Sequence, residues 1–353
     1  MHEHKQNQCK RKVKHRKNVM GLIIFCITVG IAFMFTYYQN LRKEIDTRQK
    51  WLETVLTEEK KWILENQGPE GEIYMNGSKA GDVNPYFACM AALGLLAETK
   101  NCPITETEKK AVGRYLDWHT GILLETDGKM GIYRKESGKL IYKEKADSED
   151  GYLGMYLFLM GKYLEKTEST DLPEYWKKGI SLALKKIQSL MQDGITQVSE
   201  ENTTVYLMDN LEVWKGLYEL EHAGLKDVQA IREMRNKLQA QIEKLFWGDA
   251  NQRWRIIENS DLYHQKEFYP DGVAQIYPLI YEFPVKEKKK QKVLYDQFTE
   301  SFQWQKLNKK RTGFLWTITG MAAAQMGDIH NLVELIGNYE TEYCKERKYP
   351  LYT

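Results

Sequence analysis

The chain has 353 residues, of which 42% are hydrophobic and 28% charged, and its formal net charge is +2. This composition provides for a sizeable core, and the length alone does not require a second domain. The five cysteines show no CxxC spacing, which argues against a thiolate metal site and leaves room for at most one disulfide, among Cys89, Cys102 and Cys344. The 22 Tyr and 9 Trp exceed what packing needs, and such rings either stack on sugars or fill cores.

The amino-terminal segment has its own charge pattern. Residues 1–18 carry seven basic side chains against one acidic side chain, and they border the uncharged segment 19–38. Twenty helical residues measure about 30 Å, the thickness of a bilayer's hydrocarbon core. We therefore expect a transmembrane signal anchor over 19–38 in the cell membrane, a basic cytoplasmic tail over 1–18, and an extracytoplasmic remainder.

Two other interpretations of this segment carry less weight. A cleaved signal peptide has a shorter apolar stretch that ends in small residues, whereas 19–38 ends in aromatic residues typical of a membrane interface. A basic arm can also bind nucleic acid, but the adjoining membrane segment already accounts for the charge. We expect no nucleic-acid partner.

The rest of the chain has the apolar spacing of helices. Residues 39–59 predict a helical stalk that leads into a domain over 60–353. Ten helices are predicted in that domain, over 84–99, 105–123, 148–166, 173–191, 204–222, 227–246, 270–281, 285–302, 311–326 and 328–342. Thr105 and Glu108 predict a capping box, and the alternating residues of 125–146 predict a β-hairpin around a Ser-Gly turn.

Loop lengths alternate along this domain. Long loops precede the helices expected at 84, 148, 204 and 270, and shorter links follow them, as in antiparallel helical hairpins stacked in a ring. The helices expected over 84–99, 148–166, 270–281 and 311–326 are the more apolar ones, whereas partners such as 105–123, 173–191 and 227–246 have a charged face. We therefore predict an inner and an outer ring of helices, with the long loops at one rim.

Polar side chains stand at the start of four of the expected helices: Asn84, Asp147 to Asp150, Asp209 and Asp271. If the outer helices run the opposite way, all four clusters meet at one end of the ring. A helical toroid builds a sugar-binding cleft in this way.

The densest cluster contains Asp147, Glu149 and Asp150, followed by Tyr152. Carboxylates this close together repel one another, so one of them can keep its proton near neutral pH, as a general acid must. In the alternative interpretation, Asp147 or Ser148 is an N-cap and the acidic first turn suits the helix dipole.

Asp209 and Glu212 lie three residues apart, on one side of a helix near its first turn. A helix amino terminus favours an ionised carboxylate, so Asp209 suits a base or an acceptor for sugar hydroxyls. Asp271 follows Pro270 at a helix start and can be explained by the dipole alone.

Other chemistries lack their motifs. The histidines show no metal-ligand spacing, and the sequence contains no GxSxG elbow, Walker loop or GxGxxG motif. We expect neither a metal nor a cofactor.

The stretches NPYFACMAALGLL, DSEDGYLGMYL, DNLEVWKGL, YPDGVAQIYPLIY and FLWTITGMAAAQMGD together resemble the six-hairpin glycosidase-like proteins of bacteria, over about residues 60–330. The resemblance implies an all-α (α/α)6 toroid. DSEDGYLGM is also similar to the SEGxGYGM stretch of family 8 glycoside hydrolases, which implies Glu149 as the acid. The DSxDSY pattern of closer relatives implies Asp150, although Gly151 replaces its Ser.

Together with the anchor expected over 19–38, this resemblance implies a membrane-anchored glycoside hydrolase that acts on an extracellular or cell-envelope polysaccharide. Asp150 or Glu149 would be the acid and Asp209 the base, with inversion expected. A non-catalytic glycan-binding or scaffold protein of exopolysaccharide assembly, and a polysaccharide lyase, are the alternatives. The remaining candidates for substrate binding are Asn84, Tyr86, Asp147, Tyr152, Glu212, Trp214, Tyr269, Asp271 and Trp316.

Overall fold

The computed structural model describes residues 43, 46–75, 81–136, 139–169, 171–264, 267–286, 288–306 and 316–344. The chain divides into two compact units, Met1–Thr57 and Glu58–Thr353. The first unit contributes residues 43 and 46–57, which are helical. The predicted tail and membrane anchor, 1–18 and 19–38, lie outside the described residues, and within the described part of the chain no helix is long and apolar enough to cross a bilayer.

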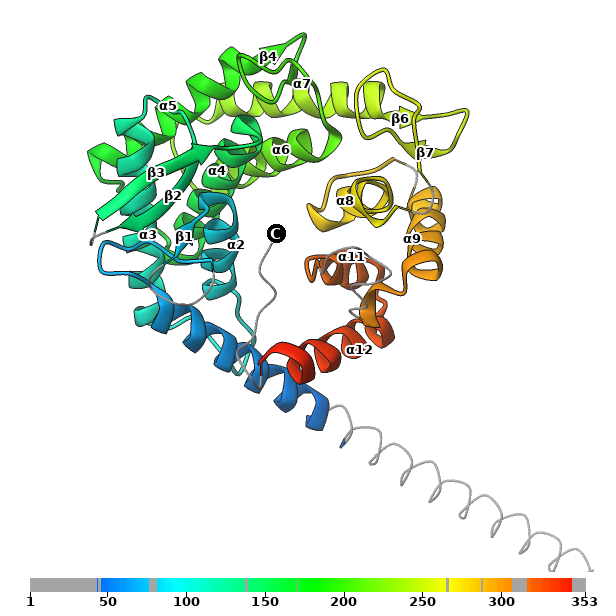
Figure 1. Ribbon diagram of the computed structural model, residues 1–353, viewed down its shortest axis with the longest axis horizontal. Helices are drawn as coiled ribbons and strands as arrows, with labels where there is room; N and C mark the ends of the chain where they lie inside the picture. Colours follow the sequence, from blue (N-terminus) through cyan, green and yellow to red (C-terminus); the bar gives the residue numbers. More distant parts are fainter. Residues whose placement is uncertain are drawn as a thin grey trace, which may run out of the picture. The chain divides into compact units, whose positions relative to one another are not determined.

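Helices make up most of the second unit and form a ring (Figure 1). The unit begins with the helical residues 58–66. The helices that border the centre of the ring are α2 (Pro85–Leu95), α4 (Glu149–Thr167), α6 (Leu207–His222), α8 (Val273–Ile280) and α11 (Thr319–Met326). Outside them lie α3 (Glu106–Glu125), α5 (Glu174–Leu190), α7 (Gln229–Phe246) and α9 (Lys288–Phe302). The last helix, α12 (Ile329–Tyr339), returns to the start of the unit, where the Tyr339 hydroxyl lies 3.5 Å from Glu59.

Burial separates the inner helices from the outer ones. Thirteen of the sixteen residues of α6 are buried, against four of the eighteen residues of α7. An inner ring predicts this burial, although the sequence of α6 is not apolar on all sides: Asn210, Glu212, Lys215, Glu219 and Glu221 are among its buried residues. The alternation of inner and outer helices is therefore confirmed for this part of the ring.

Glycines bring the inner helices α4 and α6 into close contact. A Cβ on Gly154 would lie 2.7 Å from the backbone nitrogen of Val213, and one on Gly161 would lie 2.5 Å from the backbone carbon of Glu219. Any side chain at either position would push the helices apart. The close approach sets the amino-terminal turns of α4 and α6, with their carboxylates, next to each other.

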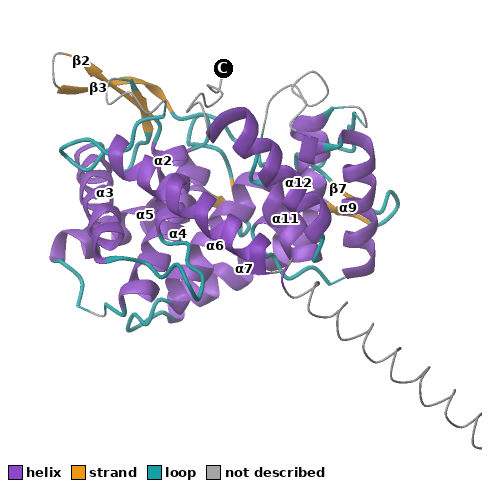
Figure 2. Ribbon diagram, turned by 90° about the horizontal axis from the view of Figure 1, so that it is seen from below, coloured by secondary structure: helices purple, strands orange, loops and turns teal. Residues whose placement is uncertain are grey.

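Short strands complete the unit. The predicted hairpin is present as β2 (Gly131–Glu136) and β3 (Lys139–Lys145), and β1 (Asp82–Val83) pairs antiparallel with β2. Figure 2 shows this sheet at one end of the helical ring. Two hairpins of two-residue strands were not predicted, because so few residues show no alternation: β4 (Met191–Gln192) with β5 (Ile195–Thr196), and β6 (Trp247–Gly248) with β7 (Arg253–Trp254).

Most helix boundaries agree with the prediction to within about three residues, and the Thr105–Glu108 capping box is confirmed. The largest difference is at the start of the helix predicted over 311–326. The structure describes this segment from residue 316 on, and the helix begins at Thr319. Three short helical turns add to the fold: η1 (Phe268–Gly272), η2 (Trp304–Lys306) and η3 (Glu340–Cys344). Cys89 is a buried free thiol.

Candidate active site

A cleft of about 350 Å³ opens where the amino-terminal ends of α2, α4 and α6 meet. It is lined by Asn84, Tyr86, Phe87, Asp147, Ser148, Tyr152, Met208, Asp209, Glu212, Tyr269, Tyr277 and Trp316. Eight of these residues were predicted from the sequence. The amino-terminal ends of these inner helices therefore converge, and side chains more than a hundred residues apart in the chain share one cleft.

The start of α2 fixes one wall. Asn84 is the N-cap, and its side chain accepts a hydrogen bond from the backbone N–H of Tyr86 at 2.9 Å. This cap satisfies one of the free N–H groups of the first turn and holds the Tyr86 backbone in place. The Tyr86 hydroxyl in turn donates to Oε1 of Glu212 at 2.5 Å.

Glu212 lies at the bottom of the cleft and is almost completely buried. Its Oε1 also accepts a hydrogen bond from Tyr277 of α8 at 2.5 Å, so one carboxylate joins three inner helices. Burial raises the pKa of Glu212 to about 7; the tyrosine hydroxyls oppose this shift, and the charges of Asp150 and Asp147 add to it. Glu212 therefore exists in both protonation states near neutral pH.

Asp150 lies behind the cleft wall rather than in it. Ser148, the N-cap of α4, donates to its Oδ1 at 2.9 Å, and the hydroxyl of Thr196 on β5 donates to its Oδ2 at 2.7 Å. The side chain is fully buried, and burial raises its pKa to about 6 although these hydrogen bonds lower it. Because two hydroxyls and the N–H of Gly151 point at it, the site favours its ionised form near neutral pH.

Asp209 faces the cleft from the first turn of α6 and is partly exposed. Burial raises its pKa well above the usual range, and the neighbouring charges of Asp150 and Glu212 raise it further. The helix dipole led us to expect an ionised Asp209, and that expectation was wrong in direction. Burial and two nearby carboxylates raise the pKa of Asp209 by more than the dipole of a single helix lowers it.

Glu149 does not reach the cleft. Its carboxylate forms an ion pair with Lys145 at 3.4 Å, and its side chain lines a separate shallow hollow together with Lys129 and Lys186. Adjacent helical residues point about 100° apart, so when Asp150 faces α6, Glu149 faces away from it. The structure thus gives no support to Glu149 as the acid.

Two other predicted residues are also absent from the cleft lining. Trp214 is buried on the other side of α6, where its ring stacks on Tyr218 at 5.3 Å and its N–H donates to Gln239 of α7. Asp271 is buried and accepts a hydrogen bond from the backbone N–H of His264 at 2.6 Å, which holds a loop. Neither residue lines the cleft, because α6 is buried on nearly all sides and the Asp271 carboxylate is used by its own loop.

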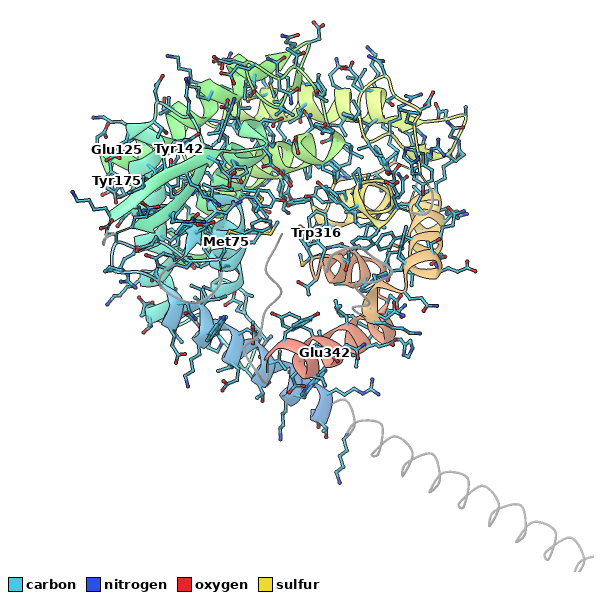
Figure 3. The ribbon with its side chains drawn as sticks, in the orientation of Figure 1. Met75, Glu125, Tyr142, Tyr175, Trp316 and Glu342 are labelled. Atoms are coloured by element: carbon cyan, nitrogen blue, oxygen red, sulfur yellow. The ribbon has the colours of Figure 1, made fainter. Side chains whose placement is uncertain are left out.

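Aromatic rings line the cleft. The rings of Tyr86 and Tyr152 lie 5.6 Å apart, and Trp316 lies 5.5 Å from Tyr269 and 5.8 Å from Tyr277. Tyr269 is 46% exposed, and Figure 3 shows Trp316 toward the centre of the ring. These rings provide flat apolar surface beside carboxylates, the combination that sugar rings and hydroxyls require.

Several residues of this site were not predicted from the sequence, including Phe87, Tyr277 and Thr196. Tyr277 stands one turn into the inner helix α8, a position equivalent to that of Glu212 in α6, and this spacing was a usable signal. Thr196 belongs to a two-residue strand with no signal of its own. Among the described residues, no group of three or more His, Cys, Asp or Glu side chains is placed to hold a metal ion.

Comparison with known proteins supports the fold. No protein-family profile and no curated protein sequence matches the chain. Among solved structures, a wild-type glycosidase superposes with a TM-score of 0.58 at 11% identity, covering 81% of this chain and 82% of that one. A variant of a glycosidase in complex with glucose gives a TM-score of 0.56 at 11% identity, over the same shares of the two chains. The second unit thus has a glycosidase-like helical toroid fold.

Proposed function

We propose that this protein is a membrane-anchored glycoside hydrolase that acts on an extracellular or cell-envelope polysaccharide. The observation that carries the proposal is the cleft itself, in which Asp209 and Glu212, both with raised pKa values, share the lining with aromatic rings, of which Tyr269 is exposed. The helical toroid shared with glycosidases supports it. The anchor rests on the sequence of 19–38.

In the proposed mechanism, Asp209 is the general acid. Its raised pKa keeps the proton on the carboxyl group near neutral pH, and the side chain reaches the cleft. It donates that proton to the glycosidic oxygen while the bond between this oxygen and the anomeric carbon breaks. Asp150 contacts no substrate and acts as a positioning residue, since its buried charge maintains the raised pKa of Asp209.

Asp147 is the proposed base. It is exposed at the mouth of the cleft, just before α4, and so approaches the substrate from a different helix than Asp209. It takes a proton from a water molecule as the water oxygen attacks the anomeric carbon, which inverts the configuration there. Inversion requires carboxyl groups about 6.5 to 9.5 Å apart, with room for water between them.

The test is to incubate the purified chain with a panel of cell-envelope polysaccharides and to measure new reducing ends. The proposal predicts cleavage of at least one polysaccharide, with the inverted anomer as the first product seen by NMR. Binding without cleavage, unchanged in Asp209→Asn, would instead show a non-catalytic glycan-binding protein. A product that absorbs in the ultraviolet would show a lyase.

A further inference from the structure

Glu212 is a cleft carboxylate that takes no part in the steps assigned to Asp209 and Asp147. It lines the cleft with both of them and is only 3% exposed. A buried carboxylate with a purely structural role is usually paired with a cation, as Glu219 is with Lys215 on the same helix. Among the described residues, no lysine, arginine or histidine pairs with Glu212. Its buried charge therefore needs another explanation.

The two oxygens of the Glu212 carboxylate have different surroundings. Oε1 accepts hydrogen bonds from Tyr86 and Tyr277, each at 2.5 Å, and the Tyr281 hydroxyl lies 3.5 Å from it. No hydrogen bond reaches Oε2 from the part of the chain that the structure describes. Oε2 is also not one of the buried polar atoms that lack a partner, so it is not sealed in the core. The tyrosines thus fix the carboxylate through one oxygen and leave the other for a ligand in the cleft.

Gly151 determines where Oε2 lies. A Cβ at this position would lie 2.5 Å from Oε2 of Glu212 and 2.8 Å from Oγ of Ser148. The missing side chain therefore lets the carboxylate approach the first turn of α4, beside Ser148 in the cleft wall. Burial is the main cause of the raised pKa of Asp209, and the charge of Glu212 adds to it, so the two carboxyl groups lie close together. Oε2 is thus near the proposed acid, where the glycosidic bond has to lie.

We propose that Glu212 is a further catalytic residue, whose ionised Oε2 stabilises the positive charge that develops on the anomeric carbon. As the glycosidic bond breaks, its electron pair goes to the leaving oxygen, which takes the proton of Asp209. The sugar ring then carries positive charge on the anomeric carbon and the ring oxygen, until water attacks and Asp147 takes the proton of that water. A carboxylate in a poorly solvated site acts on this charge more strongly than one in water. The inference rests on the proposed function, because it requires that a glycosidic bond is broken.

The titratable groups that face Glu212 come from every inner helix packed against it: Tyr86 of α2, Asp147 and Asp150 at the start of α4, Asp209 of α6, and Tyr277 and Tyr281 of α8 and its end. Burial raises the pKa of Glu212 to about 7, the tyrosine hydroxyls lower it, and the charges of Asp150 and Asp147 raise it. Activity should therefore rise with pH through about 7, as Glu212 loses its proton, while Asp209 still keeps its own.

The experiment uses the polysaccharide that the full chain cuts in the test of the proposed function. Glu212→Gln keeps the shape of the side chain and an acceptor for the tyrosine hydroxyls, so the protein should stay folded in urea unfolding curves. We expect kcat to fall by about 10²-fold, because a charge that acts only in the transition state is lost. KM should change by less than about threefold, since binding of the substrate itself does not need that charge. The rise of activity through about pH 7 should disappear.

Two further variants separate catalysis from structure. Tyr277→Phe removes one hydroxyl that stabilises the ionised form of Glu212, so the rise of activity should move to higher pH. Glu219→Gln is the matched control, the same substitution at a buried position on the same helix, and it should keep both kcat and the pH profile at temperatures where it is folded.

An unchanged kcat in Glu212→Gln would overturn the inference, as would a loss confined to KM. A rise through pH 7 that persists in Glu212→Gln would assign it to another group and would also overturn the inference. If the wild-type chain cuts the polysaccharide and Glu212→Gln cuts it equally well, the proposed hydrolase stands and only the role of Glu212 falls. If the wild-type chain cuts none of the polysaccharides, both proposals fall.

Discussion

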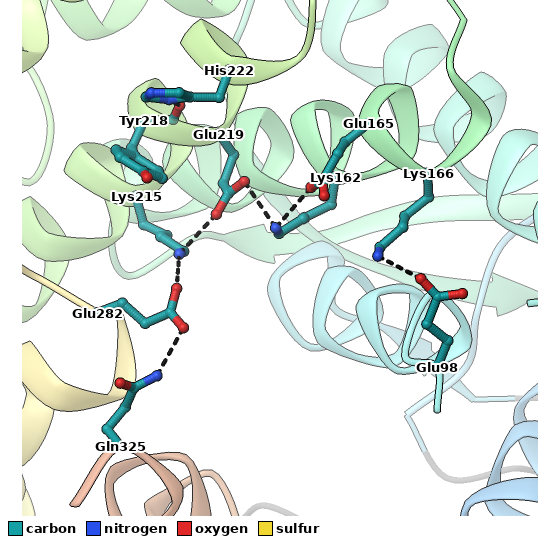
Figure 4. Close-up of polar contacts among 10 residues, drawn as sticks. All are labelled: Glu98, Lys162, Glu165, Lys166, Lys215, Tyr218, Glu219, His222, Glu282 and Gln325. Atoms are coloured by element: carbon teal, nitrogen blue, oxygen red, sulfur yellow. Dashed lines mark hydrogen bonds and ion pairs between the residues drawn. The ribbon is translucent and has the colours of Figure 1, made fainter. Parts of the chain in front are cut away.

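Buried charges are arranged differently at the two ends of the inner helices α4 and α6. At the carboxyl-terminal end, Lys215 pairs with Glu219 at 2.8 Å and with Glu282 at 2.6 Å, and Lys162 pairs with Glu219 at 3.1 Å (Figure 4). At the amino-terminal end, the cleft carboxylates Asp209 and Glu212 have no lysine or arginine partner among the described residues.

The same helix shows the consequence. Glu212 and Glu219 lie seven residues apart on α6 and are both buried, but only Glu219 has cationic partners. The hydrogen bond from Lys215 holds the pKa of Glu282 below its usual range, whereas burial without a cation raises that of Glu212 to about 7. One end of the ring is thus suited to stability and the other to proton transfer, since a buried charge is costly unless it is paired.

The largest expected effect is on catalysis at the cleft end. Asp209→Asn keeps the shape of the side chain but removes its proton-donating carboxyl group, so hydrolysis should fall about 10³-fold with the fold intact. Reducing-end assays measure the loss. Asp193→Asn, in the exposed β4–β5 turn, is the matched control and should retain full activity. Full activity in Asp209→Asn would remove Asp209 as the acid.

The second largest effect is expected on stability, at the carboxyl-terminal end of α4 and α6, where the buried charges are paired. Lys215→Met removes the cation between Glu219 and Glu282 and should lower the free energy of unfolding by about 3 kcal/mol. Glu212→Gln still accepts the tyrosine hydrogen bonds and removes an unpaired acid, so it should change stability by less than about 1 kcal/mol. Urea unfolding compares the two variants. An equal loss of unfolding free energy in Lys215→Met and Glu212→Gln would contradict the difference between the two ends of α4 and α6.

The third effect is on the pH dependence of stability. The pKa of Glu212 is raised to about 7 on folding, so the folded state binds more protons than the unfolded state between about pH 4 and 7. Its contribution to stability is therefore complete below about pH 4 and is lost as the pH rises toward 7. Glu212→Gln should reduce this slope in unfolding curves recorded across that range. An unchanged slope would assign the effect to other groups.

The smallest expected effect is on sugar binding. Trp316→Ala removes a ring from the cleft and should weaken oligosaccharide binding roughly tenfold, which corresponds to about 1.4 kcal/mol. Calorimetry with an uncleaved oligosaccharide and the Asp209→Asn background measures it. Tyr175→Ala, on the outer side of the ring in Figure 3, is the control and should bind normally.

The sequence predicted the convergence of Asn84, Asp147 and Asp209, because helix periodicity and alternating loop lengths determine which helix ends meet. It could not choose between Glu149 and Asp150, since these neighbours differ only in the rotation of α4 about its axis. It misplaced Trp214 because α6 is buried on nearly every side, and a tryptophan suits both a cleft and a core.

The electrostatics were harder to predict than the positions. The helix dipole is visible in the sequence, and so is Glu212, three residues from Asp209 on α6, but Asp150, the other carboxylate that raises the pKa of Asp209, lies on α4. The effect of Asp150 depends on the close contact of α4 with α6, which glycines make possible. Only the assembled core contains this information.

The cleft end raises the pKa values of Asp209 and Glu212, so that both carboxyl groups bind protons near neutral pH. The most direct measurement is a titration of ¹³C-labelled aspartate and glutamate carboxyls by NMR, with Asp209→Asn and Glu212→Gln to assign the two signals. We predict a midpoint near pH 7 for Glu212 and one well above the normal aspartate range for Asp209. Midpoints below about pH 5 for both groups would contradict the account.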